Sequence, residues 1–247
     1  MPQKEIEKAL EIIKEAKKGV VFTGAGLSTA SGIPDFRSAN GIWTQYPVRE
    51  YAYIDAFTKN PKKVWDFFKL RIQEMLAVLP NKAHIALAQL EKKGYLTALI
   101  TQNIDNLHQR AQSKNVLELH GSLNNAHCLE CDSQFPLKDE WIKSPSLPLC
   151  STCQKILKPG VVFFGEPLPQ DIFKKAMEQT LSSGFVIVAG TSAEVFPAAQ
   201  IPYSAKRQGS AIIEINKEPT SLTQSITDVF LQGKVEEILP LIEEGLA

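Results

Sequence analysis

Residues 23–37, TGAGLSTASGIPDFR, decide the fold, because they carry three of the chain's 14 glycines directly after a short apolar run. That run, residues 19–22, is β-branched and bounded by glycine, which is typical of a buried parallel strand. Where a strand breaks into Gly-Ala-Gly, backbone amides can approach a phosphate, since glycine has no Cβ to hold it off. The stretch is therefore a candidate nucleotide-binding loop.

The loop departs from the standard nucleotide fingerprints. In G-x-G-x-x-G the third glycine would fall at position 29, which is Thr29, and no acid follows a second strand at the usual ~20-residue offset. A Walker loop is excluded because no Gly-Lys-Ser/Thr follows. The GAG run alone fits a nucleotide loop and a plain tight turn equally well. The adjacent IPDFR run at 33–37 favours the nucleotide loop, because an acid, an aromatic and an arginine exceed what a turn needs.

The composition is that of a soluble globular protein. With 247 residues, the chain can form one large domain or a domain with an inserted lobe. Apolar residues make up 44% and charged residues 22%, which argues against disorder. Basic and acidic residues balance at 27 each, so we expect no direct nucleic-acid binding.

The cysteines form the most specific pattern in the chain. All four occur as two C-x-x-C pairs, Cys128 with Cys131 and Cys150 with Cys153. Positions 132–149 separate the pairs, a spacing within the ~15–20 residues of a four-cysteine zinc site. Four thiolates would fill the zinc tetrahedron and leave no position for water, which predicts a structural ion. His127 is a conceivable alternative ligand, but two complete pairs make it unnecessary.

The apolar runs, the N-terminal residues and the cysteines together predict the cellular location of the protein. No apolar run approaches the ~18 residues of a membrane helix, so no membrane association is expected. Residues 1–18 are charged throughout and space apolar residues at helical intervals, which predicts an amphipathic helix and not a signal peptide. Together with reduced cysteines, this predicts a cytoplasmic protein.

Apolar runs alternate with helical patterns along the chain. Strands are predicted at 19–22, 96–101, 116–119, 185–189, 211–215 and near 229, with 161–165 returning to the main sheet after the cysteine segment. Helices are predicted at 61–79, 81–94, 170–181, and from about 106, 197 and 234. This alternation specifies an α/β fold with a doubly wound parallel sheet. Residues 38–79 are rich in aromatics, and we interpret them as a small helical lobe with its own core.

Ligands of such sheets bind beyond the carboxyl ends of the strands. At these ends the sequence has GAG (24–26), QNID (102–105), His120, GTS (190–192) and Asn216, which predicts one ligand crevice. His120 stands at a strand end before a glycine, where a neutral imidazole could act as a general base. His84, in an amphipathic helix, is interpreted as packed or half-exposed, and His108 as structural.

With these residues in view, the sequence resembles the sirtuin family of NAD-dependent protein deacylases over essentially its whole length. The ordered blocks that carry the resemblance are GAGLSTASGIPDFR, TQNIDNLH, ELHGS, the paired cysteines, VVFFGE, and GTS followed by Val195 and Pro197-Ala198-Ala199. The resemblance implies a Rossmann-like large domain, here residues 1–37, 80–123 and 158–247. It also implies a small domain built from a helical module, 38–79, and a zinc-binding module, 124–157.

The resemblance further implies a reaction. NAD is consumed as a co-substrate, and the acyl group of an acyl-lysine protein passes to ADP-ribose, releasing nicotinamide and free lysine. His120 matches the family's base, with Asn103 as its catalytic partner. The matching cofactor residues are Gly24, Ala25, Gly26, Thr29, Asp35, Phe36, Arg37, Gln102, Asn103, Ile104, Asp105, Gly190, Thr191, Ser192, Asn216, Lys217 and Lys234. The substrate peptide would add as a strand along Val162, Phe164, Gly165, Glu166, Glu194, Val195 and Phe196.

The acyl pocket departs from one branch of the family. That branch binds acidic acyl groups with a Tyr-x-x-Arg pair, whereas this chain has Phe68 and Arg71 at the matching positions. Phenylalanine fits an apolar pocket, so the resemblance favours deacetylation, with longer or acidic acyl chains as alternatives. Glu194 departs from a frequently hydrophobic position; it fits both selection of basic peptides and a simply solvated carboxylate. Mono-ADP-ribosyl transfer, and a zinc-ribbon module that only senses NAD, are the alternative functions. Chromatin proteins and metabolic enzymes are candidate substrates.

Overall fold

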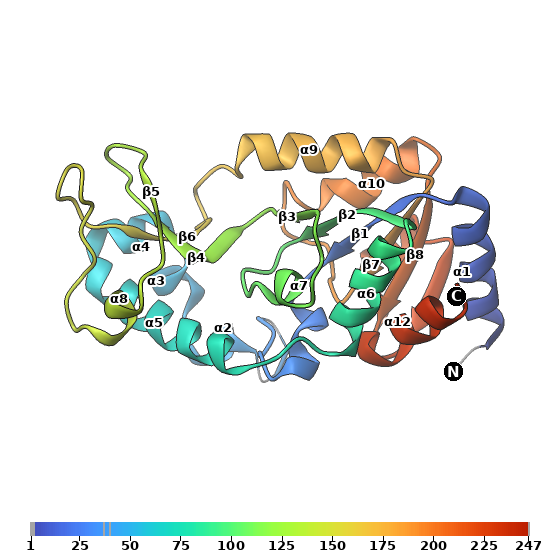
Figure 1. Cartoon of the computed structure of the whole chain (residues 1–247), viewed down its shortest axis with the longest axis horizontal. Coiled ribbons are helices and arrows are strands. Elements are labelled where there is room, and N and C mark those ends of the chain that lie inside the picture. The colour runs from blue at the N-terminus through green and yellow to red at the C-terminus, as the bar shows by residue number, and fades with distance from the viewer. Residues whose placement is uncertain (1–2, 37, 40, 247) are drawn as a thin grey trace.

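The computed structural model describes residues 3–36, 38–39 and 41–246. A larger and a smaller lobe lie along the long axis of the molecule (Figure 1). Within the described residues, six parallel strands form the sheet of the larger lobe in the order β3-β2-β1-β7-β8-β9. The strands are β1 Gly19–Thr23, β2 Leu96–Thr101, β3 Val116–Glu118, β7 Phe185–Ala189, β8 Ala211–Asn216 and β9 Val229–Gln232. The predicted doubly wound α/β fold is confirmed.

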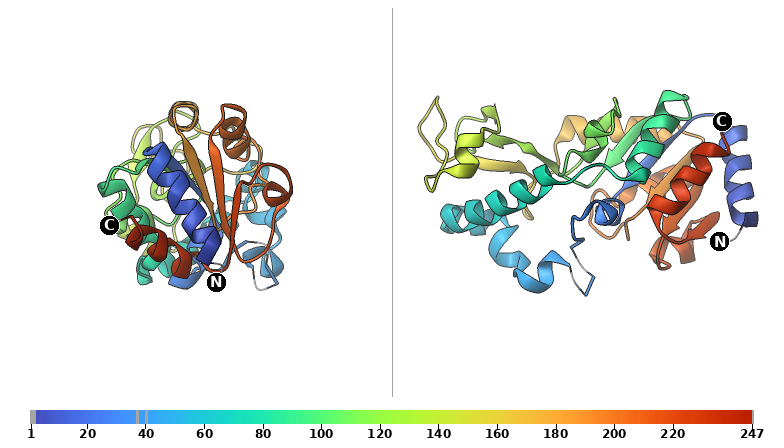
Figure 2. Two further views of the ribbon diagram at one scale, coloured as in Figure 1. Left: turned by 90° about the vertical axis from the view of Figure 1, so that its right-hand side faces the viewer. Right: turned by 60° about the horizontal axis from the view of Figure 1, so that its bottom comes forward.

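Helices cover both faces of this sheet, because its strands are apolar on both sides. Val21 of β1 belongs to a core shared with α1, α6 and α12, whereas Val20 and Phe22 face a core shared with α9, α10 and α11. The alternation follows the two-residue period of a strand. Figure 2 shows α1 and α12 near each other at the outer end of the lobe. The helices are α1 Gln3–Ala16, α6 Lys82–Lys92, α7 Leu107–Arg110, α9 Gln170–Leu181, α10 Gln200–Arg207, α11 Ser221–Ser225 and α12 Val235–Glu244.

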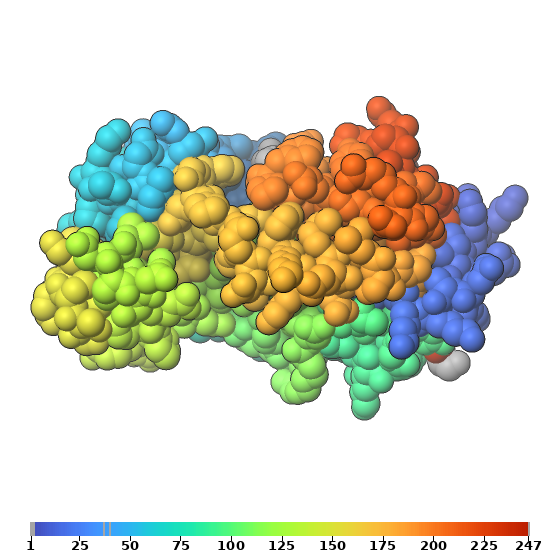
Figure 3. Space-filling model, turned by 90° about the horizontal axis from the view of Figure 1, so that it is seen from above, coloured from blue at the N-terminus to red at the C-terminus, as the bar shows by residue number. Residues whose placement is uncertain are grey.

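The smaller lobe joins the helical module to the cysteine segment. An antiparallel sheet in the order β5-β4-β6 is flanked by short helices and by one long helix, α5. Seen from above, the cyan helical module lies beside the green-to-yellow cysteine segment (Figure 3). Its elements are α2 Ile42–Gln45, α3 Val48–Tyr51, α4 Ile54–Lys59, α5 Pro61–Ala77, β4 Gly121–His127, β5 Gln134–Pro136, α8 Asp139–Lys143 and β6 Lys158–Val161.

The two modules share one hydrophobic core. Trp65 of α5 is fully buried, and its Nε1 donates a hydrogen bond of 2.7 Å to the carbonyl oxygen of Leu157. Lys69, one turn further along α5, donates to the carbonyl oxygen of Ser144 at 2.6 Å. The aromatics of the helical module therefore pack against the cysteine segment as well as against one another.

One strand assignment is wrong. Residues 161–165 do not return to the main sheet: β6 ends at Val161, which pairs with Gly121 of β4, and Phe164 forms a bridge with Tyr53 of the helical module. An apolar run shows that a segment is buried but not which sheet it joins. The small sheet also extends beyond the 124–157 segment, from Gly121 to Val161. Among the described residues, no helix combines the length and apolar character needed to cross a bilayer.

Candidate active site

A cavity of about 700 Å³ opens at the carboxyl ends of the parallel strands and reaches into the smaller lobe. Its size falls in the usual range of small-molecule sites, ~300–1,000 Å³. All five predicted strand ends contribute to it. The lining residues from these ends are Gly24, Ala25, Gly26, Gln102, Asn103, Ile104, His120, Gly190, Thr191, Ser192 and Asn216. The predicted crevice therefore exists, and segments far apart in the sequence meet in it.

The glycines of the first loop bring two strand ends together. Strands β1 and β7 pair in register and end at the same level, Thr23 beside Ala189. The amide of Gly26 donates to the carbonyl oxygen of Gly190 at 2.9 Å, and a Cβ on Gly26 would lie 2.8 Å from that oxygen. Glycine is thus required here for loop-to-loop packing. The Gly26 amide is already paired within the protein, which differs from our expectation that it points at a phosphate.

A buried polar network fixes the side chain of Asn103. Its Nδ2 donates to the carbonyl oxygen of Gly24 at 3.0 Å and to Ser28 Oγ at 3.1 Å. The Ser28 hydroxyl in turn donates to Asp105 Oδ2 at 2.6 Å. Because both amide hydrogens of Asn103 are used, its carbonyl oxygen is the atom left to meet a ligand in the cavity. Ser28 was not among the predicted residues, although it lies within the predicted loop.

Asp105 stands behind the cavity wall and does not line it. Its carboxyl group accepts from Ser28 and from the backbone amide of Leu107 at 2.9 Å. Burial raises the pKa of Asp105 above its ordinary value, and these hydrogen bonds oppose that rise. The structure therefore gives Asp105 a place in the network that supports Asn103.

The ring of His120 is oriented by a backbone carbonyl group. Its Nδ1 lies 3.1 Å from the carbonyl oxygen of Gln102. A carbonyl oxygen can only accept, so Nδ1 carries the hydrogen and Nε2 keeps the lone pair of the neutral ring. Burial lowers the pKa of His120, more than the hydrogen bond to Gln102 raises it. His120 therefore lines the cavity as a neutral imidazole suited to accept a proton.

The other histidines lie away from the cavity lining. His84 is completely buried, and the backbone amide of Asn81 donates to its Nδ1 at 3.4 Å. His108 is buried against Thr23 and stacks edge-on with His84, with the ring centroids 5.1 Å apart. The structural interpretation of both residues is consistent with these contacts.

The predicted peptide segments border the mouth of the cavity. Val162, Phe164, Gly165, Glu166 and residues 194–196 all line it. Phe164 and Phe196 are large apolar side chains that remain 39% and 65% exposed, which leaves two apolar surfaces for a partner. Glu166 is held from within, because its Oε2 accepts from the amide of Phe163 at 2.7 Å and pairs with the buried Lys158 at 3.0 Å.

The pocket in the smaller lobe is aromatic and contains one cation. Phe68 is buried and stacks on Phe163, with the ring centroids 5.5 Å apart. Arg71 lines the cavity, pairs with Glu74 at 2.7 Å, and lies over the rings of Tyr46 and Phe67. The guanidinium of Arg71 is thus paired through one nitrogen with Glu74, while its buried Nε has no hydrogen-bond partner among the described residues.

Lys234 lies outside the cavity lining; its Nζ pairs with Glu237 at 3.1 Å, and its neighbours Gly233 and Val235 line the cavity instead. Arg37 lies outside the described residues. Thr29, Asp35, Phe36 and Lys217 line the cavity as predicted.

Further lining residues were missed from the sequence. They come mainly from the helical module, from the run after the cysteine segment and from the segments after β8 and β9. They are Ser38, Ile42, Trp43, Ala52, Phe67, Met75, Val161, Phe163, Leu168, Pro197, Glu218, Pro219, Thr220, Gly233 and Val235. Most are apolar or sit in turns, so their residue type gave no chemical signal.

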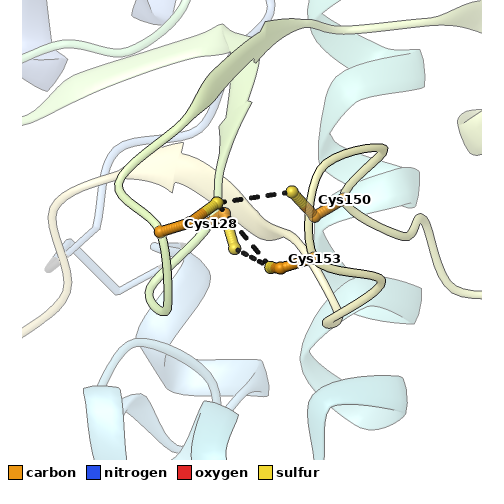
Figure 4. Close-up of side chains that lie close together, drawn as sticks. Cys128, Cys150 and Cys153 are labelled. Atoms are coloured by element: carbon orange, nitrogen blue, oxygen red, sulfur yellow. Dashed lines mark hydrogen bonds between the residues drawn. The ribbon is translucent and has the colours of Figure 1, made fainter.

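The four cysteines converge on one point from two loops (Figure 4). Their Sγ atoms all lie within 4.8 Å of one another, with 3.4 Å between Cys128 and Cys153 and 3.6 Å between Cys131 and Cys150. A tetrahedral ion with zinc–sulfur bonds of about 2.3 Å places its sulfurs roughly 3.8 Å apart. The cysteines are therefore positioned to bind one zinc ion. His127 instead forms a hydrogen bond between its Nε2 and Oδ1 of Asp132, at 2.7 Å.

The fold and the site define a nucleotide-binding α/β protein with a candidate base in its cleft and a separate metal module. The Sir2 family model matches residues 24–197. An NAD-dependent protein deacylase of Pyrococcus furiosus is 46% identical over 239 residues, covering 95% of each chain. The chain therefore belongs to the Sir2 family.

Solved structures agree with this assignment. A mutant Sir2 homologue in complex with ADP ribose superposes with a TM-score of 0.93 at 45% identity, covering 97% of this chain and 96% of that one. A structure of Sir2 with a p53 peptide and NAD+ gives a TM-score of 0.87 at 38% identity, covering 98% and 99%.

Proposed function

We propose that the protein is an NAD-dependent protein-lysine deacylase that prefers acetyl groups. The observation that carries the proposal is His120, a neutral imidazole whose tautomer is fixed by Gln102, in a cavity where five strand ends meet. The ADP-ribose and NAD complexes of similar Sir2 structures, and the name of the Pyrococcus relative, support it.

The two ends of the cavity suit the two ends of a dinucleotide. At one end, Asn103 offers a fixed carbonyl oxygen beside Ile104 and His120, which suits the nicotinamide amide and its ribose. At the other end, Asn216, the last residue of β8, and the adjacent Lys217 suit adenosine. Thr191 and Ser192 line the same cavity and offer hydroxyl groups to the diphosphate. Thr29 also lines it, but its hydroxyl already donates to the carbonyl oxygen of Gly26 at 3.0 Å. Bound NAD supplies the ADP-ribose that accepts the acyl group.

In this arrangement His120 acts as the general base. Its Nε2 takes the proton of a ribose hydroxyl, while the Nδ1–H bond to Gln102 stabilises the imidazolium that forms. Phe36, stacked on Trp43 with ring centroids 5.4 Å apart, covers the cavity and excludes water from the reacting ribose.

The acyl-lysine peptide binds at the mouth of the cavity. Segments 164–166 and 194–196 border it from opposite lobes, so an extended peptide between them would use backbone hydrogen bonds more than side chains. The substrate is therefore a protein lysine in an accessible, extended segment. We place chromatin proteins and metabolic enzymes among the candidates, and a cytoplasmic location accords with cysteines gathered as metal ligands.

Product analysis tests the proposal. The protein is incubated with NAD and an acetyl-lysine peptide, and the peptide, nicotinamide and ADP-ribose products are separated by mass. We expect free lysine peptide and O-acetyl-ADP-ribose in equal amounts, matching the nicotinamide released. Label from NAD appearing on protein, with the peptide still acetylated, would instead show mono-ADP-ribosyl transfer.

The acyl preference is tested at Arg71. Its guanidinium already pairs with Glu74 and lies over Tyr46, and Phe68 offers no hydroxyl. A succinyl carboxylate would therefore meet one buried Nε–H of Arg71 and no tyrosine hydroxyl. We expect kcat/KM for acetyl-peptide to exceed that for succinyl-peptide by about tenfold or more, since an unpaired polar group in an apolar pocket is costly. Arg71→Ala should change this ratio by less than about threefold. A loss of succinyl turnover confined to Arg71→Ala would contradict the apolar pocket.

A further inference from the structure

At the outer end of the cavity, a carboxyl group is buried behind the wall. Glu214 of β8 is completely buried and is not among the cavity-lining residues. Its two oxygens accept hydrogen bonds from four side chains. These are Thr220 Oγ1 at 2.5 Å, Thr223 Oγ1 at 2.6 Å, Thr227 Oγ1 at 2.8 Å and Asn216 Nδ2 at 3.1 Å.

The four bonds divide between the two oxygens. Oε1 receives Asn216 and Thr220, both of which line the cavity. Oε2 accepts from Thr223 and Thr227, neither of which is among the cavity-lining residues. Burying a carboxyl group is costly unless it is fully hydrogen-bonded, so a side chain of this kind holds its neighbours in one arrangement.

The bond to Asn216 fixes which end of that amide meets a ligand. Asn216 Nδ2 donates to Glu214 Oε1 and also to the carbonyl oxygen of Thr191 at 3.0 Å. Both partners are acceptors, so a flipped amide would set its oxygen against two other oxygens. Both N–H groups are used, and Oδ1 of Asn216 accepts no hydrogen bond from any described residue. The amide therefore presents an acceptor to the cavity.

We propose that Glu214 is a positioning residue that makes the adenosine end of the site select a ribose hydroxyl over a ribose phosphate. An amide oxygen accepts a hydrogen bond from a hydroxyl, whereas a phosphate brings only acceptor oxygens and negative charge to the same place. This inference rests on the proposed function, because that function places adenosine beside Asn216.

Binding of two inert ligands tests the inference. Calorimetry measures Kd for ADP-ribose and for its 2′-phosphate in wild type, Glu214→Ala and Glu214→Gln. In Glu214→Ala the amide of Asn216 keeps only its hydrogen bond to the carbonyl oxygen of Thr191. Its orientation is then held less tightly, so we expect Kd for ADP-ribose to rise about tenfold, the effect of losing one well-placed hydrogen bond. The ratio of Kd for the 2′-phosphate to Kd for ADP-ribose should fall by a similar factor. Glu214→Gln, whose amide oxygen can still face Asn216, should recover most of both.

Kinetics separate positioning from catalysis. In Glu214→Ala, KM for NAD should rise with kcat kept within about twofold of wild type, because the reacting groups lie at the other end of the cavity. Thr227→Val is the matched control: it removes a bond to Oε2 without touching Asn216, and it should leave Kd for ADP-ribose unchanged. In an Asn216→Ala background, Glu214→Ala should add less than about twofold to Kd, because the two act as one unit.

The outcomes are distinct. The inference is overturned if Glu214→Ala folds and its Kd for ADP-ribose and its preference over the 2′-phosphate are unchanged. It is also overturned if Glu214→Ala loses kcat at constant KM for NAD. In either case, deacylation by the wild-type protein would still support the proposed function. If Glu214→Ala does not fold, NMR of the wild-type chain decides. Both side-chain amide hydrogens of Asn216, assigned by their loss in Asn216→Ala, should exchange slowly with water. One fast-exchanging hydrogen facing the cavity would contradict the inference.

Discussion

At the scale of single residues, the surroundings of His120 determine its tautomer and favour its neutral form. The carbonyl oxygen of Gln102 holds Nδ1–H, and burial disfavours the charged ring. These two effects keep Nε2 unprotonated and accessible at neutral pH. A residue type that titrates near neutrality is thereby converted into one that is ready to accept a proton.

The pH profile tests this account. The pKa of His120 lies below its ordinary value of 6.5 because burial outweighs the hydrogen bond. Deacylation needs the neutral form, so log(kcat/KM) should be constant at neutral pH and fall only as the pH drops through a value below 6.5. The control is far-UV circular dichroism over the same range, which should stay constant. An acidic limb with its midpoint above 6.5 would contradict the account.

The positions of several site residues could be predicted from the sequence, and others were missed for physical reasons. His120, Asn103 and the glycines stand at strand ends, where the fold exposes them, so pattern and position agreed. Ser28 and Glu214 were missed because their importance comes from hydrogen bonds to residues distant in sequence. Asp105 was predicted as a ligand residue but lies one layer behind.

At the scale of elements, the main sheet was predictable because its strands are short, apolar and bounded by turn residues. Strands 96–101 and 185–189, and helix 170–181, coincide with β2, β7 and α9. Helix α7 is only one turn, Leu107–Arg110, and periodicity cannot resolve an element that short. The run 161–165 was assigned to the wrong sheet, since Val161 and Phe163 belong to the small lobe's core.

Two cysteines of the metal site belong to the core of the smaller lobe. Cys128 and Cys150 are completely buried in the same core as Trp65 and Leu157, so their sulfurs join packing and coordination. We expect Cys128→Ala or Cys150→Ala to lose stoichiometric zinc and to unfold this lobe, because the binding energy of the ion is folding energy. Limited proteolysis should then cleave within 124–157 while the larger lobe survives.

The matched control for this prediction is Ser151→Ala, an exposed substitution between the cysteines of the second pair. It should keep both zinc and protease resistance. A cysteine variant that remains resistant with one zinc still bound would show that the fourth thiolate is dispensable.

At the scale of the whole molecule, the active site exists only where the two lobes meet. The larger lobe supplies the strand ends and His120, and the smaller lobe supplies the aromatic pocket around Phe68. Val162 links them directly, since its amide donates to the carbonyl oxygen of His120 at 2.8 Å. The peptide, the acyl group and the dinucleotide can therefore meet in one cavity, which no single segment of sequence would show.

The central claim is that this cavity consumes NAD to deacylate lysine with His120 as the base, and one paired measurement on wild type and His120→Ala tests it most directly. Calorimetry gives the Kd for ADP-ribose, and mass spectrometry gives the rate at which free lysine peptide forms from acetyl-peptide and NAD. We predict that His120→Ala keeps Kd within about threefold while the rate falls ~10²–10⁴-fold, the usual contribution of a general base. Unaltered turnover in His120→Ala would contradict the claim.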